Sequence, residues 1–153
     1  MADAESAPIV VGVDFSKNGR KAFDAAVNLA DDLGATLVVV HAFPEMKTPS
    51  LMVGDLGRKV IDEARAEISN EEAMTLAEEW VSVARKRDLD VVPVAADGKP
   101  SDLILEQADA HNAGIIVVGT HGRTGLKRVL LGSVAEDVVR RSKRPVLVIP
   151  MAD

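Results

Sequence analysis

Short apolar runs recur along the chain and alternate with longer segments in which apolar and charged residues are mixed. The runs are continuous and rich in β-branched residues, which is typical of parallel strands buried on both faces. They are Ile9–Val13, Thr36–Ala42, Val91–Ala95, Ile115–Val118 and Val146–Ile149. We therefore predict five strands within one buried sheet.

The segments between these runs place apolar residues at the three- and four-residue spacing of a helix with one buried face. The predicted helices are Gly19–Leu33, Ile61–Arg87, Pro100–His111 and Ser133–Ser142. Gly34 marks the end of the first helix, and Pro100 marks the start of the third. Ser133 and Glu136 predict a capping box at the start of the fourth. The alternation predicts an α/β fold, an open parallel sheet with right-handed connections and helices on both faces.

The size and composition of the chain fit one domain that spans residues 1–153, of which 47% are hydrophobic. The absence of cysteine excludes disulfides and thiolate metal sites, and it fits a cytoplasmic protein. Residues 1–8 lack the basic and apolar parts of a signal peptide. No apolar run reaches the length of a membrane span, so we expect no membrane insertion.

The charge of the chain is unevenly distributed. A net charge of −6 argues against binding to nucleic acid. From Thr120 to Arg144, however, seven residues are basic and two are acidic, whereas the rest of the chain has 18 − 7 = 11 basic and 24 − 2 = 22 acidic residues. A basic segment in an acidic protein indicates a local anion site.

This basic segment is also rich in glycine. The fourth apolar run leads into Gly119 and Gly122, and Gly132-Ser133 then precedes the last helix. Glycines let the backbone approach a ligand closely, and free amides at a helix N-terminus bind anions. The pattern predicts a phosphate cradle; the alternative is an ordinary strand-to-helix turn.

The spacing Gly119-x2-Gly122-x9-Gly132-Ser133, followed by the run Arg144–Pro150, resembles the ATP-binding branch of the universal stress protein family. The segments Val11–Ser16, Val40–Ala42 and Gly98–Pro100 extend the resemblance over nearly the whole chain. It implies a Rossmann-like sheet of the adenine nucleotide alpha hydrolase-like type, in the order 3-2-1-4-5. It also implies ATP, with Mg or Mn bound through the phosphates, and a homodimer that pairs through Val146–Ile149.

Site residues follow from the same resemblance. Gly119, Gly122, Gly132 and Ser133 are expected to contact the ribose and the phosphates, and the amide of Val134 is expected to donate a further hydrogen bond. Asp14 is expected to lie beside the nucleoside, and the main chain of Ala42 is expected to contact the adenine. Arg123, Lys127 and Arg128 either contact the triphosphate or are solvated loop residues. The expected cofactor-binding residues are Val13, Asp14, Ala42, Gly119, Gly122, Arg123, Gly132, Ser133 and Val134.

Several of these residues also have purely structural interpretations. Asp14 and Ser133 are both typical helix-capping residues. His121 is expected to be a solvated loop residue, whereas Trp80 is expected in the core. His41 and His111 are expected to pack structurally, and the three histidines lack ligand spacing, so no protein-built metal site is predicted. The basic residues Arg140, Arg141, Lys143 and Arg144 are expected to stabilise the end of the last helix.

Three functions remain open from the sequence. The first is a regulatory, nucleotide-responsive dimer that acts on a protein partner in a stress response. The second is an enzyme of ATP hydrolysis or phosphoryl transfer, but no Walker lysine, kinase signature or evident base is present, so at most slow hydrolysis and no catalytic residue are predicted. The third is an interaction module without nucleotide. A dinucleotide-binding fold would place its glycines after the first strand, where Val13–Ser16 stands instead.

Overall fold

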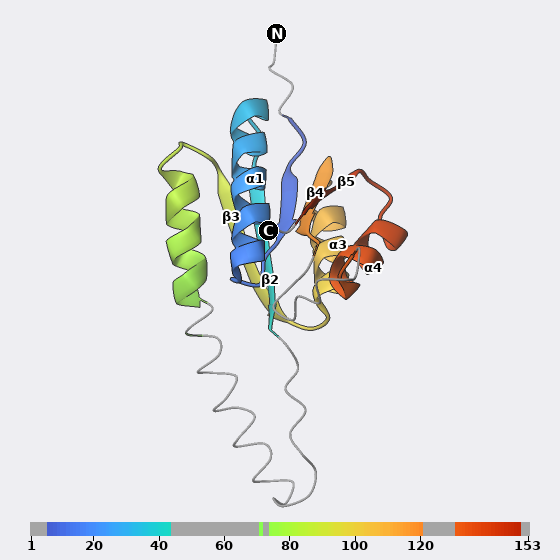
Figure 1. Ribbon diagram of the computed structural model, residues 1–153. Helices are drawn as coiled ribbons and strands as arrows, with labels where there is room; N and C mark the ends of the chain where they lie inside the picture. Colours follow the sequence, from blue (N-terminus) through green and yellow to red (C-terminus); the bar gives the residue numbers. More distant parts are fainter. Residues whose placement is uncertain (1–5, 44–70, 72–73, 121–130, 151–153) are drawn as a thin grey trace, which may run out of the picture.

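The computed structural model describes residues 6–43, 71, 74–120 and 131–150, whose strands form one five-stranded parallel sheet (Figure 1). The strands are β1 (Ile9–Gly12), β2 (Leu37–Phe43), β3 (Val91–Asp97), β4 (Ile115–Gly119) and β5 (Val146–Ile149). Their order is β3-β2-β1-β4-β5, and every neighbouring pair is parallel. The predicted strands and their order are confirmed, with ends that differ by at most two residues.

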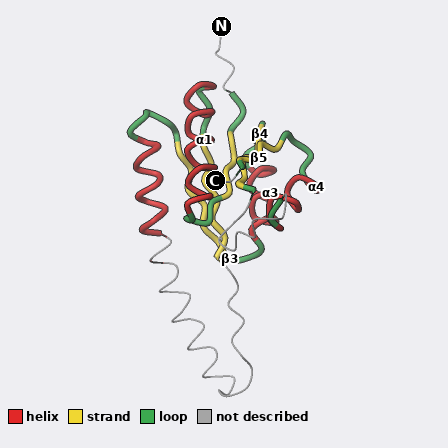
Figure 2. Tube along the Cα trace, in the orientation of Figure 1, coloured by secondary structure: helices red, strands yellow, loops and turns green. Residues whose placement is uncertain are grey.

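Helices cover both faces of the sheet, as predicted (Figure 2). They are α1 (Lys17–Leu33), a helix at 74–85, α3 (Pro100–Ala110) and α4 (Ser133–Arg141). The predicted helix Ile61–Arg87 is confirmed over 74–85, while 61–70 and 72–73 lie outside the described residues. Among the described helices, none is long and apolar enough to cross a membrane.

Alternate strand residues point to opposite faces and build two separate cores. Val11 and Val39 pack with α1 and the helix at 74–85, whereas Val10 and Val38 pack with α3 and α4. Trp80 belongs to the first core and is only 6% exposed, which confirms its predicted packing role. Burial of each aliphatic side chain stabilises the fold by about 1.5–3 kcal/mol. Because the apolar runs are continuous, both faces of the sheet gain this stabilisation.

Glycine and proline mark the helix ends where the sequence predicts them. Gly34 follows α1 with φ 62°, and its amide donates to the carbonyl of Asp31 at 3.3 Å. Gly98, with φ 135°, precedes α3, which has Lys99 at its N-cap and Pro100 at its first position. L-residues rarely adopt these backbone angles, so both glycines are needed for the chain to change direction.

Candidate functional site

The carboxyl ends of β1 and β4 lie side by side at the centre of the sheet. From β1 the chain passes through α1 to β2 on one side, whereas β4 and β5 lie on the other side. Ligands of open α/β sheets bind in the crevice beyond such a reversal of strand order. Asp14 follows β1 and Thr120 follows β4, so the fold brings both predicted segments to this crevice.

A hydrogen-bonded turn holds the carboxylate of Asp14 at the crevice. Asp14 Oδ1 accepts hydrogen bonds from the amide of Ser16 at 3.0 Å and from its hydroxyl at 2.5 Å. The Ser16 hydroxyl oxygen in turn accepts from the amide of Gly19 at 3.0 Å. Ser16 is therefore the N-cap of α1, and Asp14 orients the capping hydroxyl instead of capping the helix itself.

The strand register directs the main chain of Ala42 toward the crevice. The amide of Leu37 donates to the carbonyl of Asp90, so odd-numbered residues of β2 bond to β3. Even-numbered residues bond to the β1 side, where the carbonyl of Val40 accepts from the amide of Val13 at 2.9 Å. Because β1 ends at residue 12, the amide and carbonyl of Ala42 face the space beyond that strand.

Beyond Val40, a histidine side chain makes the next hydrogen bond between the β2 and β1 segments. The carbonyl of Val13 accepts a hydrogen bond from Nδ1 of His41 at 2.9 Å, which requires the proton of a neutral ring to be on Nδ1. The His41 ring also contacts the rings of Phe15 and Phe43, with centroids 4.5 and 5.3 Å away. The predicted structural role of His41 is confirmed, because its ring is bonded to the Val13 carbonyl and contacts two phenylalanine rings.

The start of α4 is tied directly to the end of β4. The Thr120 amide donates to the carbonyl of Ile149 at 2.9 Å, and the Thr120 carbonyl accepts from the amide of Gly132. Gly132 is the N-cap, with φ −69° and ψ 164°, and it has no side chain to cap the helix. Gly132 thus offers no side-chain acceptor to the first-turn amides at the positive end of the helix dipole.

The predicted capping box of Ser133 and Glu136 is wrong. Gly132 takes the extended N-cap conformation, so Ser133 is the first helical residue and its side chain is exposed. Glu136 is then one position too far along the helix to reach back to the N-cap amide. Five residues of the predicted loop lie outside the described part of the chain, and their roles stay predictions: His121, Gly122, Arg123, Lys127 and Arg128.

A buried carboxylate joins α4 to the turn before α3. Asp137 Oδ2 accepts from the ammonium group of Lys99 at 2.8 Å and from the hydroxyl of Ser101 at 2.5 Å. Its two oxygens also accept from Arg140 at 2.8 Å and from Arg141 at 2.9 Å. These donors, led by Lys99, hold the pKa of Asp137 well below its usual range. The start of α3 is thereby fixed to the middle of α4.

Most of the basic residues at the end of α4 are engaged structurally, as predicted. Arg141 also pairs with Asp102 at 2.6 Å, and these partners raise the pKa of the guanidinium group. Arg144 pairs with Asp109 at 2.7 Å and donates to the carbonyl of Ala113. Asp137 was not predicted from the sequence, because its partners Lys99 and Ser101 lie 38 and 36 positions away along the chain.

The parallel sheet, its order and the reversal at the switch point define an open α/β protein of the Rossmann-like type. The model of the universal stress protein family matches residues 6–150, and the chain belongs to that family.

Known proteins of this family align over most of the chain. It is 34% identical to the universal stress protein YxiE of Bacillus subtilis over 92% of this chain and 97% of YxiE. The solved structure of MJ0577 of Methanocaldococcus jannaschii has a TM-score of 0.83 at 24% identity and covers 96% of this chain and 98% of its own. A universal stress protein in complex with cAMP has a TM-score of 0.71 at 26% identity, with coverages of 97% and 100%.

Proposed function

We propose that this protein binds ATP in the crevice between β1 and β4 and acts as a nucleotide-responsive regulatory module in the cytoplasm. The main chain of Ala42 is the observation that carries the proposal. Its amide and carbonyl face the space beyond β1, because the strand register turns them there. A neighbouring donor and acceptor match the edge of adenine, which presents an amino group next to a ring nitrogen.

The other end of the crevice suits the phosphates. The amides of Ser133 and Val134 stand at a helix N-terminus whose N-cap residue, Gly132, has no side chain, and anions are stabilised at such positions. Gly119 leads into this region, and Gly132 lets a ligand approach the backbone without meeting a side chain. Asp14, fixed by Ser16, is suited to hydrogen-bond the ribose or to reach a metal through water. A Mg or Mn ion bound through the phosphates would neutralise part of their charge.

The family supports an adenine nucleotide as the ligand. A relative of the same fold has been solved with cAMP, so an adenine ring and a phosphate are accepted by this architecture in that protein. We extend this ligand class to ATP on the basis of the glycine spacing and the basic segment that includes Arg123. The nucleotide would bias the conformation that a protein partner recognises, as expected of a regulatory module with at most slow hydrolysis.

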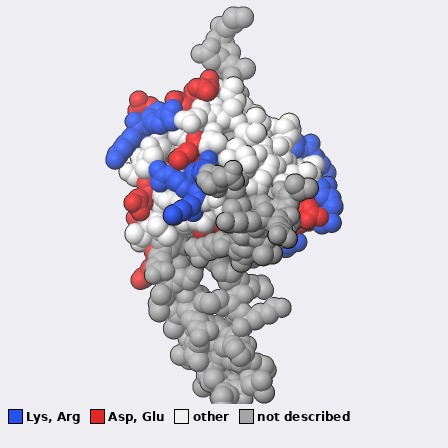
Figure 3. Space-filling model, in the orientation of Figure 1, with Lys and Arg blue, Asp and Glu red and all other residues white. Residues whose placement is uncertain are grey.

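We also propose that the protein is a homodimer that pairs through β5. The amide of Ile116 donates to the carbonyl of Pro145, so Val146 and Val148 direct their main-chain groups away from β4 to the open edge. Leu147 is 40% exposed, and the surface over β4 and β5 is largely uncharged in Figure 3. An apolar edge strand with open main-chain groups favours pairing about a two-fold axis.

Thermal unfolding with Mg-ATP tests the nucleotide proposal. ATP at about 100 times its dissociation constant should raise the unfolding free energy by about 2.7 kcal/mol. Gly132→Val should abolish the effect without unfolding the protein, because valine adopts the φ and ψ of this position without strain. Val139→Ala, at an exposed site of the same helix, is the matched control.

Two results would contradict the proposal. If millimolar ATP, AMP and cAMP all leave the unfolding temperature of the wild type unchanged, the crevice is not a nucleotide site. If ATP stabilises the protein but phosphate is released steadily at enzymic rates, the protein is an ATPase and not a regulatory module.

A further inference from the structure

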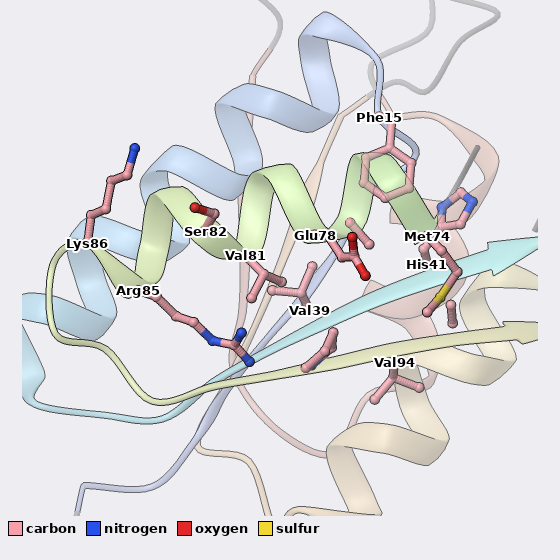
Figure 4. Close-up of a pocket in the computed structure, with 13 residues that line it drawn as sticks. Phe15, Val39, His41, Met74, Glu78, Val81, Ser82, Arg85, Lys86 and Val94 are labelled. Carbon is pink, nitrogen blue, oxygen red and sulfur yellow. The ribbon is translucent and has the colours of Figure 1, made fainter. Parts of the chain in front are cut away.

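A separate cavity lies on the face of the sheet opposite to α3 and α4. Its volume is about 520 Å³, and it runs between the helix at 74–85 and the strands β2 and β3 (Figure 4). Its walls are mainly apolar and include Val39, Val81, Pro93 and Ala95. Pockets of this size, with apolar walls and a few convergent polar groups, are typical of small-molecule sites.

Aromatic rings close one end of this groove. Phe15 lies 4.5 Å from the ring of His41 and 5.0 Å from the ring of Trp80, measured between centroids. The backbone of Phe15 has φ 60°, which is strained for a bulky residue and persists only when its surroundings fix it. The bonds of the neighbouring Asp14 and the two ring contacts supply that constraint. The groove therefore has a preformed apolar wall at this end.

A cationic group stands at the opposite end. In Figure 4 the guanidinium group of Arg85 extends from the helix over the strands, whereas Lys86 points away from the groove. Within the described residues, no ion pair engages Arg85, so its charge is available to a ligand. Glu78 points toward the strands between the two ends and disfavours a second negative charge there. The charge pattern suits one anionic group at the Arg85 end only.

We propose that this groove binds an organic monoanion with an extended apolar body. The carboxylate or sulfonate lies at Arg85, and the body lies along Pro93 and Ala95 toward the ring of Phe15. The helix from residue 74 to residue 85 spans about 16 Å at 1.5 Å per residue, which suits a medium-chain fatty acid or an elongated aromatic acid. The groove lies apart from the nucleotide crevice and approaches it only at Phe15, and Glu78 makes it unsuitable for a polyphosphate.

Fluorescence titration with two matched probes tests this site on the full chain. Anilinonaphthalene sulfonate and phenylnaphthylamine share an aromatic body, but only the first carries a negative charge. Arg85→Gln should lower the affinity for the sulfonate probe by about three- to fivefold, as expected for one exposed charge pair. It should leave the affinity for the neutral probe unchanged. Lys143→Gln, which removes an exposed cation elsewhere, should leave the binding of both probes unchanged.

Substitutions that fill the groove should abolish the binding of both probes. Ala95→Leu projects a larger side chain from β3, and Ser82→Leu does so from an exposed helix position if the strand variant does not fold. Dodecanoate below its micellar concentration should displace the sulfonate probe, whereas dodecyltrimethylammonium should not.

The proposal is wrong if Arg85→Gln leaves the affinity for the sulfonate unchanged, or if the filled variants bind both probes like the wild type. It is also wrong if Mg-ATP displaces the probe and Arg85→Gln weakens Mg-ATP as much as it weakens the probe, because the probe would then occupy the nucleotide site. If the protein binds no nucleotide but shows the expected pattern with the two probes, only the proposed nucleotide function is refuted and the groove proposal stands.

Discussion

The hydroxyl of Ser101 donates a 2.5 Å hydrogen bond to Asp137 Oδ2, although the two residues are 36 positions apart. Ser101 is fully buried, and Asp137 is nearly so. The bond connects the first turn of α3 to α4, whose N-terminus we propose as the phosphate end of the site. Polar groups at this depth are stable only because each finds a partner.

Ser101→Ala should destabilise the protein by about 1.5–3 kcal/mol, the usual contribution of a hydrogen bond to a charged group. Alanine leaves the buried carboxylate with one donor fewer while the backbone of α3 is unchanged. Urea unfolding measures the change as a lower midpoint at constant slope. Ser82→Ala, which removes an exposed hydroxyl, should leave the midpoint unchanged. Equal midpoints for all three proteins would show that the bond contributes no stability.

Acidification should weaken the protein through Asp137. Lys99 is the main cause of its lowered pKa, and Ser101, Arg140 and Arg141 add to the effect. An unfolded aspartate has a pKa of about 3.9, so the unfolded chain takes up this proton first as the pH falls. The stability from Asp137 is therefore complete above the unfolded pKa and is lost below it.

Asp137→Asn removes this titration and is the test of the pH dependence. The wild type should lose more unfolding free energy than the variant between about pH 5 and pH 2, where unfolded carboxylates titrate. Urea titrations at a series of pH values measure both slopes. Parallel pH profiles would mean that the donors around Asp137 do not favour its charged form in the folded state.

The sheet was predictable from the sequence because continuous β-branched runs have few alternatives to burial on both faces. Helix starts were less predictable, because capping depends on the local backbone: Gly132 takes the N-cap position that the pattern assigned to Ser133. The bond of His41 to the Val13 carbonyl and the contacts of Asp137 with Lys99 join distant segments. No spacing along the chain encodes such contacts, so only the folded structure reveals them.

Gly19→Ala should separate site geometry from helix stability. Gly19 lies in the first turn of α1, and alanine is a better helix former than glycine by at most about 1 kcal/mol. A Cβ at Gly19, however, would lie 2.5 Å from Asp14 Oδ1 and 3.3 Å from its amide, so the carboxylate must shift. We expect nucleotide affinity to fall about fivefold, equivalent to a loss of about 1 kcal/mol. Calorimetric titration with Mg-ATP measures the change.

The matched control lies at the other end of α1. Gly34→Ala places alanine at φ 62° with no atom within 4 Å of the new Cβ, so only backbone strain results. It should cost about 1–2 kcal/mol of stability and leave nucleotide affinity unchanged. If both variants lose affinity equally, the effect comes from general destabilisation and not from Asp14.

Trp80 should report on the nucleotide site. It is the only tryptophan of the chain, and its ring meets that of Phe15 edge-on at 5.0 Å and 80°. Because Phe15 directly follows Asp14, a ligand that contacts Asp14 should alter the surroundings of the indole. We expect a saturable change in tryptophan fluorescence whose midpoint equals the calorimetric dissociation constant. Phe15→Leu should remove most of this signal while binding persists; an unchanged amplitude in Phe15→Leu would rule out this route.

The two edges of the sheet should differ in their effect on assembly. On β3 the odd-numbered residues face outward, so Pro93 already removes one amide from that edge, and edge prolines oppose strand pairing. On β5 the outward amides of Val146 and Val148 are both present. Val148→Pro should therefore convert a dimer of twice 16.2 kDa into a monomer, as measured by sedimentation equilibrium. Ala95→Pro removes an outward amide from the opposite edge and should remain dimeric. If both variants dissociate, or neither does, the pairing surface is not β5.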